Sequence, residues 1–333
     1  MNNKKIITIS LLILLSMIAL LIFLICFPKV EEDKTIYYEN QEMPVKVTVK
    51  NGANNFTVYK DSDKWVVSSL ENIPINESFC YSLFSAAKSL FAEHIFEPKT
   101  SLDDYGLENP SIVVTNDFGD KQTTIKIGNA NVSNTAYYCL KEDSNQIGLI
   151  SIPNVNPFLR GISDYASLIL IPYSMRTIDD DGNWISGGIT SCTVKRQDLS
   201  EPIELIADAN GDLNIVSPSE VTLSADAKNQ LKNAPFSLAA ESLYEVNPTD
   251  AAIDLCKLNS PKAEIKYVIN GETYEFKIGD ISNSKQYAHN IYDDNAQDST
   301  VNKSYYLMMN GIPAIYTANQ SDIPWLNMEF VNN

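Results

Sequence analysis

The sequence predicts an α+β protein: a tandem duplication of a strand-rich module with one main helix each, preceded by one transmembrane helix. Three observations support this prediction. Residues 102–128 align with residues 253–279 at a constant offset of 151, without a gap. Apolar residues around the aligned segments alternate with polar ones, which is the spacing of half-buried strands. Residues 6–27 contain no charged residue. Self-similarity at a fixed offset indicates one structural unit that is used twice.

The pattern divides the 333 residues into six segments. They are a cytoplasmic stub at 1–5, a transmembrane helix at 6–27, a linker at 28–44, repeat module 1 at 45–174, an inter-module connection at 175–189 and repeat module 2 at 190–331.

The apolar run at 6–27 is long enough to cross a hydrocarbon core of roughly 30 Å as a helix. Lys4 and Lys5 precede it, and three acidic residues follow at 31–33. The positive-inside rule therefore places the N-terminus in the cytoplasm and the bulk of the chain outside, in a single-pass protein of the cell membrane. The lipid bilayer is thus one expected partner.

Two other fates of this segment are open, namely cleavage as a signal peptide and lipidation of Cys26. Cleavage requires small residues after a shorter apolar core, whereas residues 24–28 are bulky throughout. Lipidation requires a small residue before the cysteine, and Ile25 is bulky. An uncleaved anchor is therefore the preferred interpretation.

Each module is expected to begin with a hairpin. In module 1, alternating apolar residues predict strands at 45–49, 56–58 and 65–67. In module 2, they predict strands at 203–205 and 213–215, joined by a turn that contains an Asn-Gly dipeptide.

The main helix of module 1 follows this hairpin. One apolar stripe runs from Phe79 to Leu90, and Asn76 or Ser78 is the expected N-cap. His94 lies near the predicted end of this helix, where a surface or capping role is expected because a helix C-terminus favours a cation.

The main helix of module 2 repeats the stripe from Ala227 to Leu238, with Ser224 as its N-cap. Proline in a helix removes a hydrogen bond and clashes with the preceding turn. Pro235 therefore predicts that this helix stops near Asn233 and then restarts or kinks.

A second hairpin is predicted in both modules, with strands at 112–114 and 125–127 and at 263–265 and 276–278. Several positions are singled out as structural repeat positions, which we interpret as scaffold. They are Trp65, Gly106, Leu107, Pro110, Gly128, Leu258, Pro261 and Gly279.

Each module closes with a tyrosine pair, an apolar segment and a short apolar stretch after a proline. The apolar segments lie at 147–152 and 312–316, and a polar insertion at 286–302 lengthens module 2. The closing stretches are Pro157-Phe158-Leu159 and Pro324-Trp325-Leu326.

The charge of the chain excludes one class of partner. The formal net charge is −17 and the sequence pI is about 4.5. Because such a surface repels phosphate backbones, no nucleic-acid partner is expected.

No motif predicts catalysis, a metal or a cofactor. The chain has two histidines and five scattered cysteines without a Cys-x-x-Cys spacing, so the cysteines are interpreted as small buried hydrophobes. The acidic run at 179–183 resembles the start of a calcium loop, but its sixth position is Trp184 instead of glycine. A solvated turn is the preferred interpretation.

Aromatic residues give one candidate surface for a ligand or partner. Tyrosine and tryptophan combine apolar area with a polar group, which suits sugar rings or peptides. Adjacent residues of a strand point to opposite faces, so one tyrosine of each pair is expected in the core. The candidate residues are Tyr137, Tyr138, Tyr305, Tyr306 and Trp325.

One set of residues resembles the bacterial "domain of unknown function 4340" family in its order and spacing. These residues are Trp65, Tyr105-Gly106-Leu107, Pro110, Ile127-Gly128, Tyr137-Tyr138 and Asp164.

The resemblance implies a single-span extracytoplasmic protein, often encoded beside ABC transporters of the gliding-motility type. It brings no catalytic residues. Module 2 departs from the pattern, with Cys256 for Tyr105 and Lys257 for Gly106, and with Leu213 for the tryptophan. A ligand site built from these positions is therefore expected in module 1 only.

The sequence thus favours a non-enzymatic, membrane-anchored extracytoplasmic accessory protein of a membrane complex, with an ABC transporter as the expected partner. The alternative is a cell-envelope module that binds polysaccharide or peptide.

Overall fold

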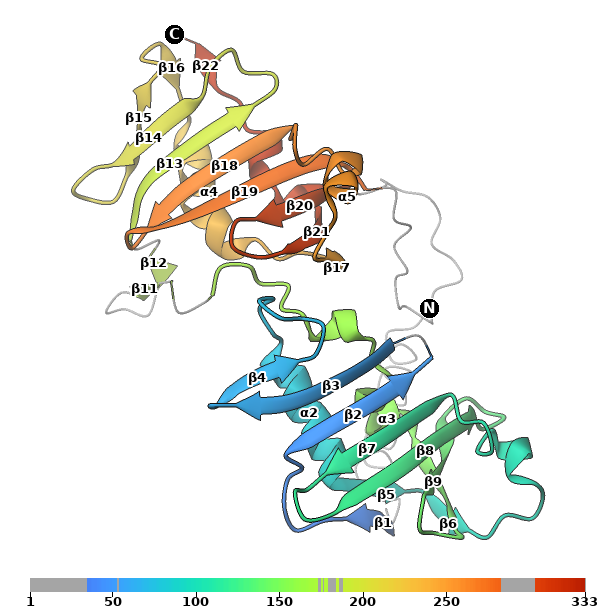
Figure 1. Ribbon diagram of the computed structural model, residues 1–333. Helices are drawn as coiled ribbons and strands as arrows, with labels where there is room; N and C mark the ends of the chain where they lie inside the picture. Colours follow the sequence, from blue (N-terminus) through green and yellow to red (C-terminus); the bar gives the residue numbers. More distant parts are fainter. Residues whose placement is uncertain are drawn as a thin grey trace, which may run out of the picture.

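The computed structural model describes residues 35–52, 54–172, 175, 177–178, 184–185, 188–282 and 303–332 (Figure 1). The predicted stub at 1–5, the predicted span at 6–27, the acidic turn at 179–183 and the polar insertion at 286–302 lie outside the described residues. No helix in the described part of the chain is both long and apolar enough to cross a membrane.

Two eight-stranded antiparallel sheets confirm that a strand-rich module is duplicated. The first sheet has the order β4-β3-β2-β7-β8-β9-β10-β6, and the second has the order β15-β14-β13-β18-β19-β20-β21-β17. Each strand of the first sheet has a counterpart at the same place in the second sheet, and the counterparts follow the same order along the chain. The register corresponds as well, because Val49 pairs with Val114 in the first sheet and Val194 pairs with Ile265 in the second.

The strands of the first sheet are β2 (Lys46–Asn51), β3 (Asn54–Asp61), β4 (Lys64–Val67), β6 (His94–Phe96), β7 (Ile112–Asp117), β8 (Gln122–Ala130), β9 (Ala136–Lys141) and β10 (Ile147–Ser151). Those of the second are β13 (Ile189–Arg196), β14 (Ile203–Ala207), β15 (Leu213–Ser217), β17 (Ser242–Val246), β18 (Ala263–Ile269), β19 (Glu272–Ile281), β20 (Ser304–Met309) and β21 (Ala314–Asn319). The alternation in the sequence did not predict β13. Three short pairs lie outside these sheets: β1 (Thr35–Glu39) with β5 (Ser89–Ala92), β11 (Thr177–Ile178) with β12 (Trp184–Ile185), and β16 (Val221–Thr222) with β22 (Val331–Asn332).

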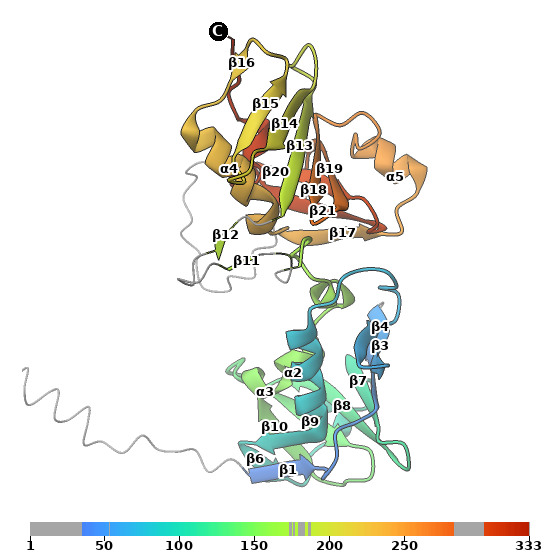
Figure 2. The same ribbon diagram turned by 90° about the vertical axis from the view of Figure 1, so that its left-hand side faces the viewer.

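Each module has one main helix. Module 1 contains α2 (Glu77–Lys88), η1 (Leu102–Tyr105), α3 (Ile152–Leu159) and η2 (Ile162–Tyr165), and module 2 contains α4 (Ala225–Ser237), α5 (Asp250–Leu255), η4 (Gln320–Asp322) and η5 (Pro324–Leu326). Figure 2 shows α2 and α3 on the same face of the first sheet. The apolar side of α2 packs onto that sheet through its buried residues, which are Cys80, Leu83, Phe84 and Ala87.

The predicted end of the first main helix is wrong. α2 ends at Lys88, and Leu90 lies in β5, where strand alternation turns its side chain into the core. His94 consequently lies in the edge strand β6, exposed to solvent, and not at a helix end. The helix stops because the following residues extend to pair with β1, an N-terminal partner that the periodicity of the helix does not reveal.

The described part of the predicted linker at 28–44 contains β1. Besides its pairing with β5, β1 is fixed by Tyr37, whose hydroxyl accepts a hydrogen bond from the Lys141 backbone N–H at 3.0 Å. The same hydroxyl lies 3.0 Å from the carbonyl oxygen of Gln146, to which it can donate. Residues 35–39 are therefore docked on the β9–β10 hairpin of module 1.

The predicted stop of the second main helix near Asn233 is also wrong. α4 continues through Pro235 to Ser237. Since proline has no N–H, the Leu231 carbonyl oxygen loses its usual helical donor. The hydroxyl of Tyr267, from β18, donates to that oxygen at 2.9 Å and replaces it.

The two modules are joined by a short strap, residues 166–169. Isolated bridges link the strap to Ile75 of module 1 and to Ala239 of module 2. One backbone N–H of the strap donates to the Pro74 carbonyl oxygen at 2.6 Å, and one of its carbonyl oxygens accepts from the Ala240 N–H at 2.8 Å. The main hydrophobic core is continuous across both modules.

Candidate functional site

The predicted tyrosine pairs occupy equivalent positions in two different sheets. Tyr137 and Tyr138 lie in β9, whereas Tyr305 and Tyr306 lie in β20. Within each pair the first ring packs against the main core and the second joins a small separate cluster. The two pairs therefore do not combine into one surface.

The burial of Trp325 excludes this residue from the candidate aromatic surface. The side chain is 0% exposed, its ring stacks on Phe276 with centroids 5.5 Å apart, and its Nε1 donates to the Tyr267 hydroxyl at 2.8 Å. Tyr305 and Tyr306 are buried too, at 7% and 9% exposure. Trp325 is buried because the closing segment of module 2 packs onto the sheet, whereas the two tyrosines are buried by their position in β20.

Module 1 retains a partly exposed aromatic cluster. Phe96, Tyr105 and Tyr138 come from β6, η1 and β9, and their ring centroids are 5.1 to 6.3 Å apart. Leu107 is buried against them. Cys256 holds the position of Tyr105 in module 2, so the three rings are not repeated among the described residues of that module.

At Gly128 and Gly279, the glycines that both modules share, the backbone of another segment comes very close. A Cβ atom on Gly128 would collide with the carbonyl oxygen of Tyr105, and one on Gly279 would collide with that of Cys256. Gly106 has a left-handed φ of 70°, and Lys257 adopts a φ of 58° at the equivalent position. Module 2 therefore keeps the same turn with a lysine, for which the left-handed conformation is sterically less favourable than for glycine.

The remaining structural repeat positions, at one of which module 2 has Leu213 in place of Trp65, lie in the core or just before a strand. Leu107, Leu258 and Trp65 are buried, and Trp65 makes an edge contact with the ring of Phe84. Pro110 and Pro261 precede β7 and β18. Asp164, the last residue of the family pattern, accepts a hydrogen bond from the Gly161 N–H at 2.9 Å.

Module 2 contains an unpredicted feature at Arg196, the last residue of β13. Its Nη1 donates to the carbonyl oxygens of Trp325 at 2.9 Å and Met328 at 2.6 Å. Its Nε and Nη2 donate to the two carboxylate oxygens of Asp198 at 2.9 and 2.6 Å. The Phe330 ring lies 5.4 Å from the guanidinium carbon. Arg196 therefore fixes the C-terminal segment against the sheet.

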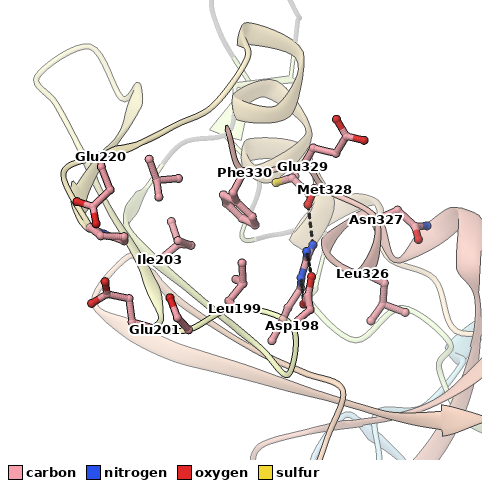
Figure 3. Close-up of a pocket in the computed structure, with 14 residues that line it drawn as sticks. Asp198, Leu199, Glu201, Ile203, Glu220, Leu326, Asn327, Met328, Glu329 and Phe330 are labelled. Carbon is pink, nitrogen blue, oxygen red and sulfur yellow. Dashed lines mark hydrogen bonds and ion pairs between the residues drawn. The ribbon is translucent and has the colours of Figure 1, made fainter. Parts of the chain in front are cut away.

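A groove of about 750 Å³ lies beside this arginine (Figure 3). Its apolar lining comes from the β13–β14 loop, β14, β16 and the C-terminal segment. The apolar residues of these segments are Leu199, Ile203, Val221, Leu326, Met328 and Phe330, and Pro218 before β16 also lines the groove. Figure 3 shows Glu201 and Glu220 on the same side of the groove, away from Leu326 and Asn327.

The groove carries negative charge. Hydrogen bonding to Arg196 holds the pKa of Asp198 below its ordinary value, so this pair contributes no net charge at neutral pH. Glu201, Glu220 and Glu329 also line the groove, are exposed, and form no ion pair with any described residue. Within the part of the chain that the structure describes, these three carboxylates therefore have no cationic partner.

Sequence reasoning missed this groove, although one signal for it exists. β2 and β3 are separated by two residues, whereas β13 and β14 are separated by residues 197–202. The longer loop supplies one wall. No local pattern indicates that Arg196 reaches a segment 129 residues further along the chain.

The described residues show no group of three or more His, Cys, Asp or Glu side chains that could hold a metal ion. The four described cysteines are buried and unpaired. Burial raises the pKa of Cys80 and of Cys192 to about 12, which keeps both thiols protonated at neutral pH.

Comparison with known proteins gives one match. Residues 65–167 match the family model of a domain of unknown function, DUF4340. The match begins at Trp65 in β4 and ends in the strap, so it covers most of module 1 and confirms the resemblance found in the sequence. No curated protein and no solved structure matches the chain.

Proposed function

We propose that this chain, whose first module carries a DUF4340 domain, is a non-enzymatic accessory protein of a membrane complex. Residues 6–27 anchor it in the cell membrane, with the N-terminus in the cytoplasm and both modules outside. An ABC transporter is the proposed partner.

The docking of β1 supports this proposal most directly. Thr35 follows the end of the apolar run at Phe27 by eight residues, and eight residues reach at most about 29 Å. The Tyr37 hydrogen bonds then attach the chain to the β9–β10 hairpin without further slack. An anchor at 6–27 thus holds module 1 next to the membrane, within reach of the outer loops of a membrane protein.

The charge of the chain favours a protein partner over the lipid surface itself. A net charge of −17 is repelled by anionic headgroups. The two histidines and the missing catalytic motifs of the sequence favour a binding role over an enzymatic one.

Extraction of the full chain in a mild detergent, followed by affinity purification and quantitative mass spectrometry, tests this proposal. We expect a permease or ATPase in stoichiometric amounts. A matched control replaces residues 1–27 with an unrelated single span, which keeps the modules outside the membrane and preserves contacts made by them. Recovery of both proteins without any stoichiometric membrane partner would contradict the proposal.

The partly exposed cluster of Phe96, Tyr105 and Tyr138 favours a second candidate function, namely binding of cell-envelope polysaccharide or peptide. Aromatic faces of this kind suit sugar rings. Retention of the detergent-solubilised full chain on purified cell wall is the measurement, with Tyr138→Ala as the variant and Tyr59→Ala as the exposed control. Equal retention of both variants would exclude this cluster as the binding site.

A further inference from the structure

The groove beside Arg196 is built from parts that module 1 does not have. Asn51 occupies the position of Arg196 in module 1, and its amide donates to the Leu159 carbonyl oxygen at 3.4 Å. The same contact with the closing segment therefore exists in both modules. In module 2 it is made by a longer side chain, and the six-residue β13–β14 loop rises beside it.

The Arg196 side chain holds the wall of the groove together and is not available to bind a ligand. All of its hydrogen-bonding nitrogens have partners within the protein, and its side chain is only 10% exposed. An anionic ligand would have to break the bond to Asp198 in order to reach it. The accessible charge of the groove is therefore that of the glutamates.

The apolar side chains at the bottom of the groove and the glutamates at its rim together determine which ligand can bind there. Ile203 and Val221 are buried, whereas Leu199, Leu326 and Phe330 remain partly exposed and present apolar area to the groove. A volume of about 750 Å³ lies within the usual range of ligand sites, roughly 300–1,000 Å³. A fitting occupant buries an apolar side chain and brings positive charge to the rim.

We propose that this groove binds a segment of a partner protein in which a bulky apolar side chain stands next to lysine or arginine. This inference rests on the proposed function, since it names the chemistry by which the membrane partner is recognised. Charge complementarity at the rim steers the encounter, and burial of the apolar side chain stabilises the complex.

Fluorescence anisotropy with two labelled octapeptides tests the chemistry. One peptide alternates lysine with leucine and phenylalanine, and the other carries glutamate in place of lysine. The full chain in detergent is expected to bind the basic peptide at least ten-fold more tightly, with affinity that falls as salt is raised from 50 to 300 mM, because screening weakens exposed charge interactions. No binding, or equal binding of both peptides, would overturn the inference.

Matched variants locate the binding. The double variant Glu201→Gln with Glu220→Gln removes two carboxylates from the rim. It is expected to lower the affinity for the basic peptide about ten-fold. Glu204→Gln with Glu108→Gln removes the same charge from exposed positions outside the groove and is expected to change affinity less than two-fold. Leu199→Ser is expected to weaken binding at every salt concentration. Equal losses in the two double variants would show a general charge effect and sink the proposal.

A crosslinking experiment separates this inference from the proposed function. A photo-reactive residue replaces Ser200, an exposed residue of the groove, or Val132, a fully exposed residue of module 1. The co-purifying membrane partner is expected to crosslink from position 200 only. A partner that co-purifies but never crosslinks from the groove overturns the inference and leaves the accessory role intact. Peptide binding without any co-purifying partner overturns the accessory role alone.

Discussion

At the scale of single residues, one buried polar side chain in each module connects the sheet to the main helix. The two side chains occupy equivalent positions in the repeat. Asn116 of module 1 donates to the Ala87 carbonyl oxygen at 3.2 Å, and Tyr267 of module 2 donates to that of Leu231 at 2.9 Å. Burial raises the pKa of Tyr267 well above its ordinary value, so its hydroxyl remains a neutral donor. Tyr267 accepts in turn from Trp325. A proline inside α4 is thereby tolerated.

Tyr267→Phe should destabilise the protein by about 2–4 kcal/mol, because it leaves two buried groups without partners, the Leu231 carbonyl oxygen and the Trp325 N–H. The measurement is the free energy of unfolding from urea titration. Tyr316→Phe is the matched control, since the Tyr316 hydroxyl is buried with no hydrogen-bond partner among the described residues. An equal effect in both variants would show that the hydrogen-bond chain does not stabilise α4.

At the scale of elements, β1 shows how a segment outside the repeat can change a repeat unit. The segment after α2 becomes strand β5 because β1 lies beside it, and Tyr37 packs directly over Gly148 of β10. A side chain at position 148 would meet the Tyr37 ring at 2.9 Å. Tyr37 is therefore held both by ring packing and by hydroxyl hydrogen bonds.

Tyr37→Phe removes the hydroxyl and keeps the ring. We expect faster amide hydrogen exchange in residues 35–39 and 89–92, corresponding to a loss of about 1–2 kcal/mol in local stability, with little change elsewhere. Tyr59→Phe changes an exposed tyrosine in β3 and should leave the exchange of both strands unaltered. Unchanged protection of β1 in the first variant would mean that pairing with β5 alone holds the strand.

At the scale of the whole molecule, the strap at 166–169 determines how the two modules are oriented. It is bonded to both modules within four residues, and the buried Leu170 and Ile171 follow it directly. These bonds to both modules hold module 2, and with it the groove, in one position relative to module 1. The partner that we propose for the groove must therefore present its binding segment at a defined place.

Ala240→Pro should loosen this arrangement, because it removes the N–H that donates to the strap. Spin labels at Val132 and Val216, both exposed, report the distance between the modules after Cys26→Ser substitution, since the four other cysteines are buried. We expect a narrow distance distribution in the parent and a broad one in the proline variant. Ala240→Gly keeps the N–H and should stay narrow. A broad distribution in the parent would refute the rigid strap.

The sequence by itself determined the duplication, the strand-rich character of the module and the resemblance of residues 65–167 to the DUF4340 family model. These features depend on local spacing, which alternation and repeated motifs record directly. The same local information could not determine which residues cover one another. Trp325 is therefore only a candidate for an aromatic surface in the sequence, whereas it lies in the core, and Leu90 is predicted in a helix, whereas it lies in a strand.

The tertiary structure alone decided the long-range contacts. β1 pairs with β5, which lies at least 50 residues further along the chain, and Arg196 reaches the backbone of Trp325 across 129 positions. Such contacts depend on loop lengths and on the partner that the fold brings alongside, neither of which leaves a periodic trace. The groove of module 2 belongs to this class, because its walls come from a loop, a short strand and the C-terminal segment, and only folding brings them together.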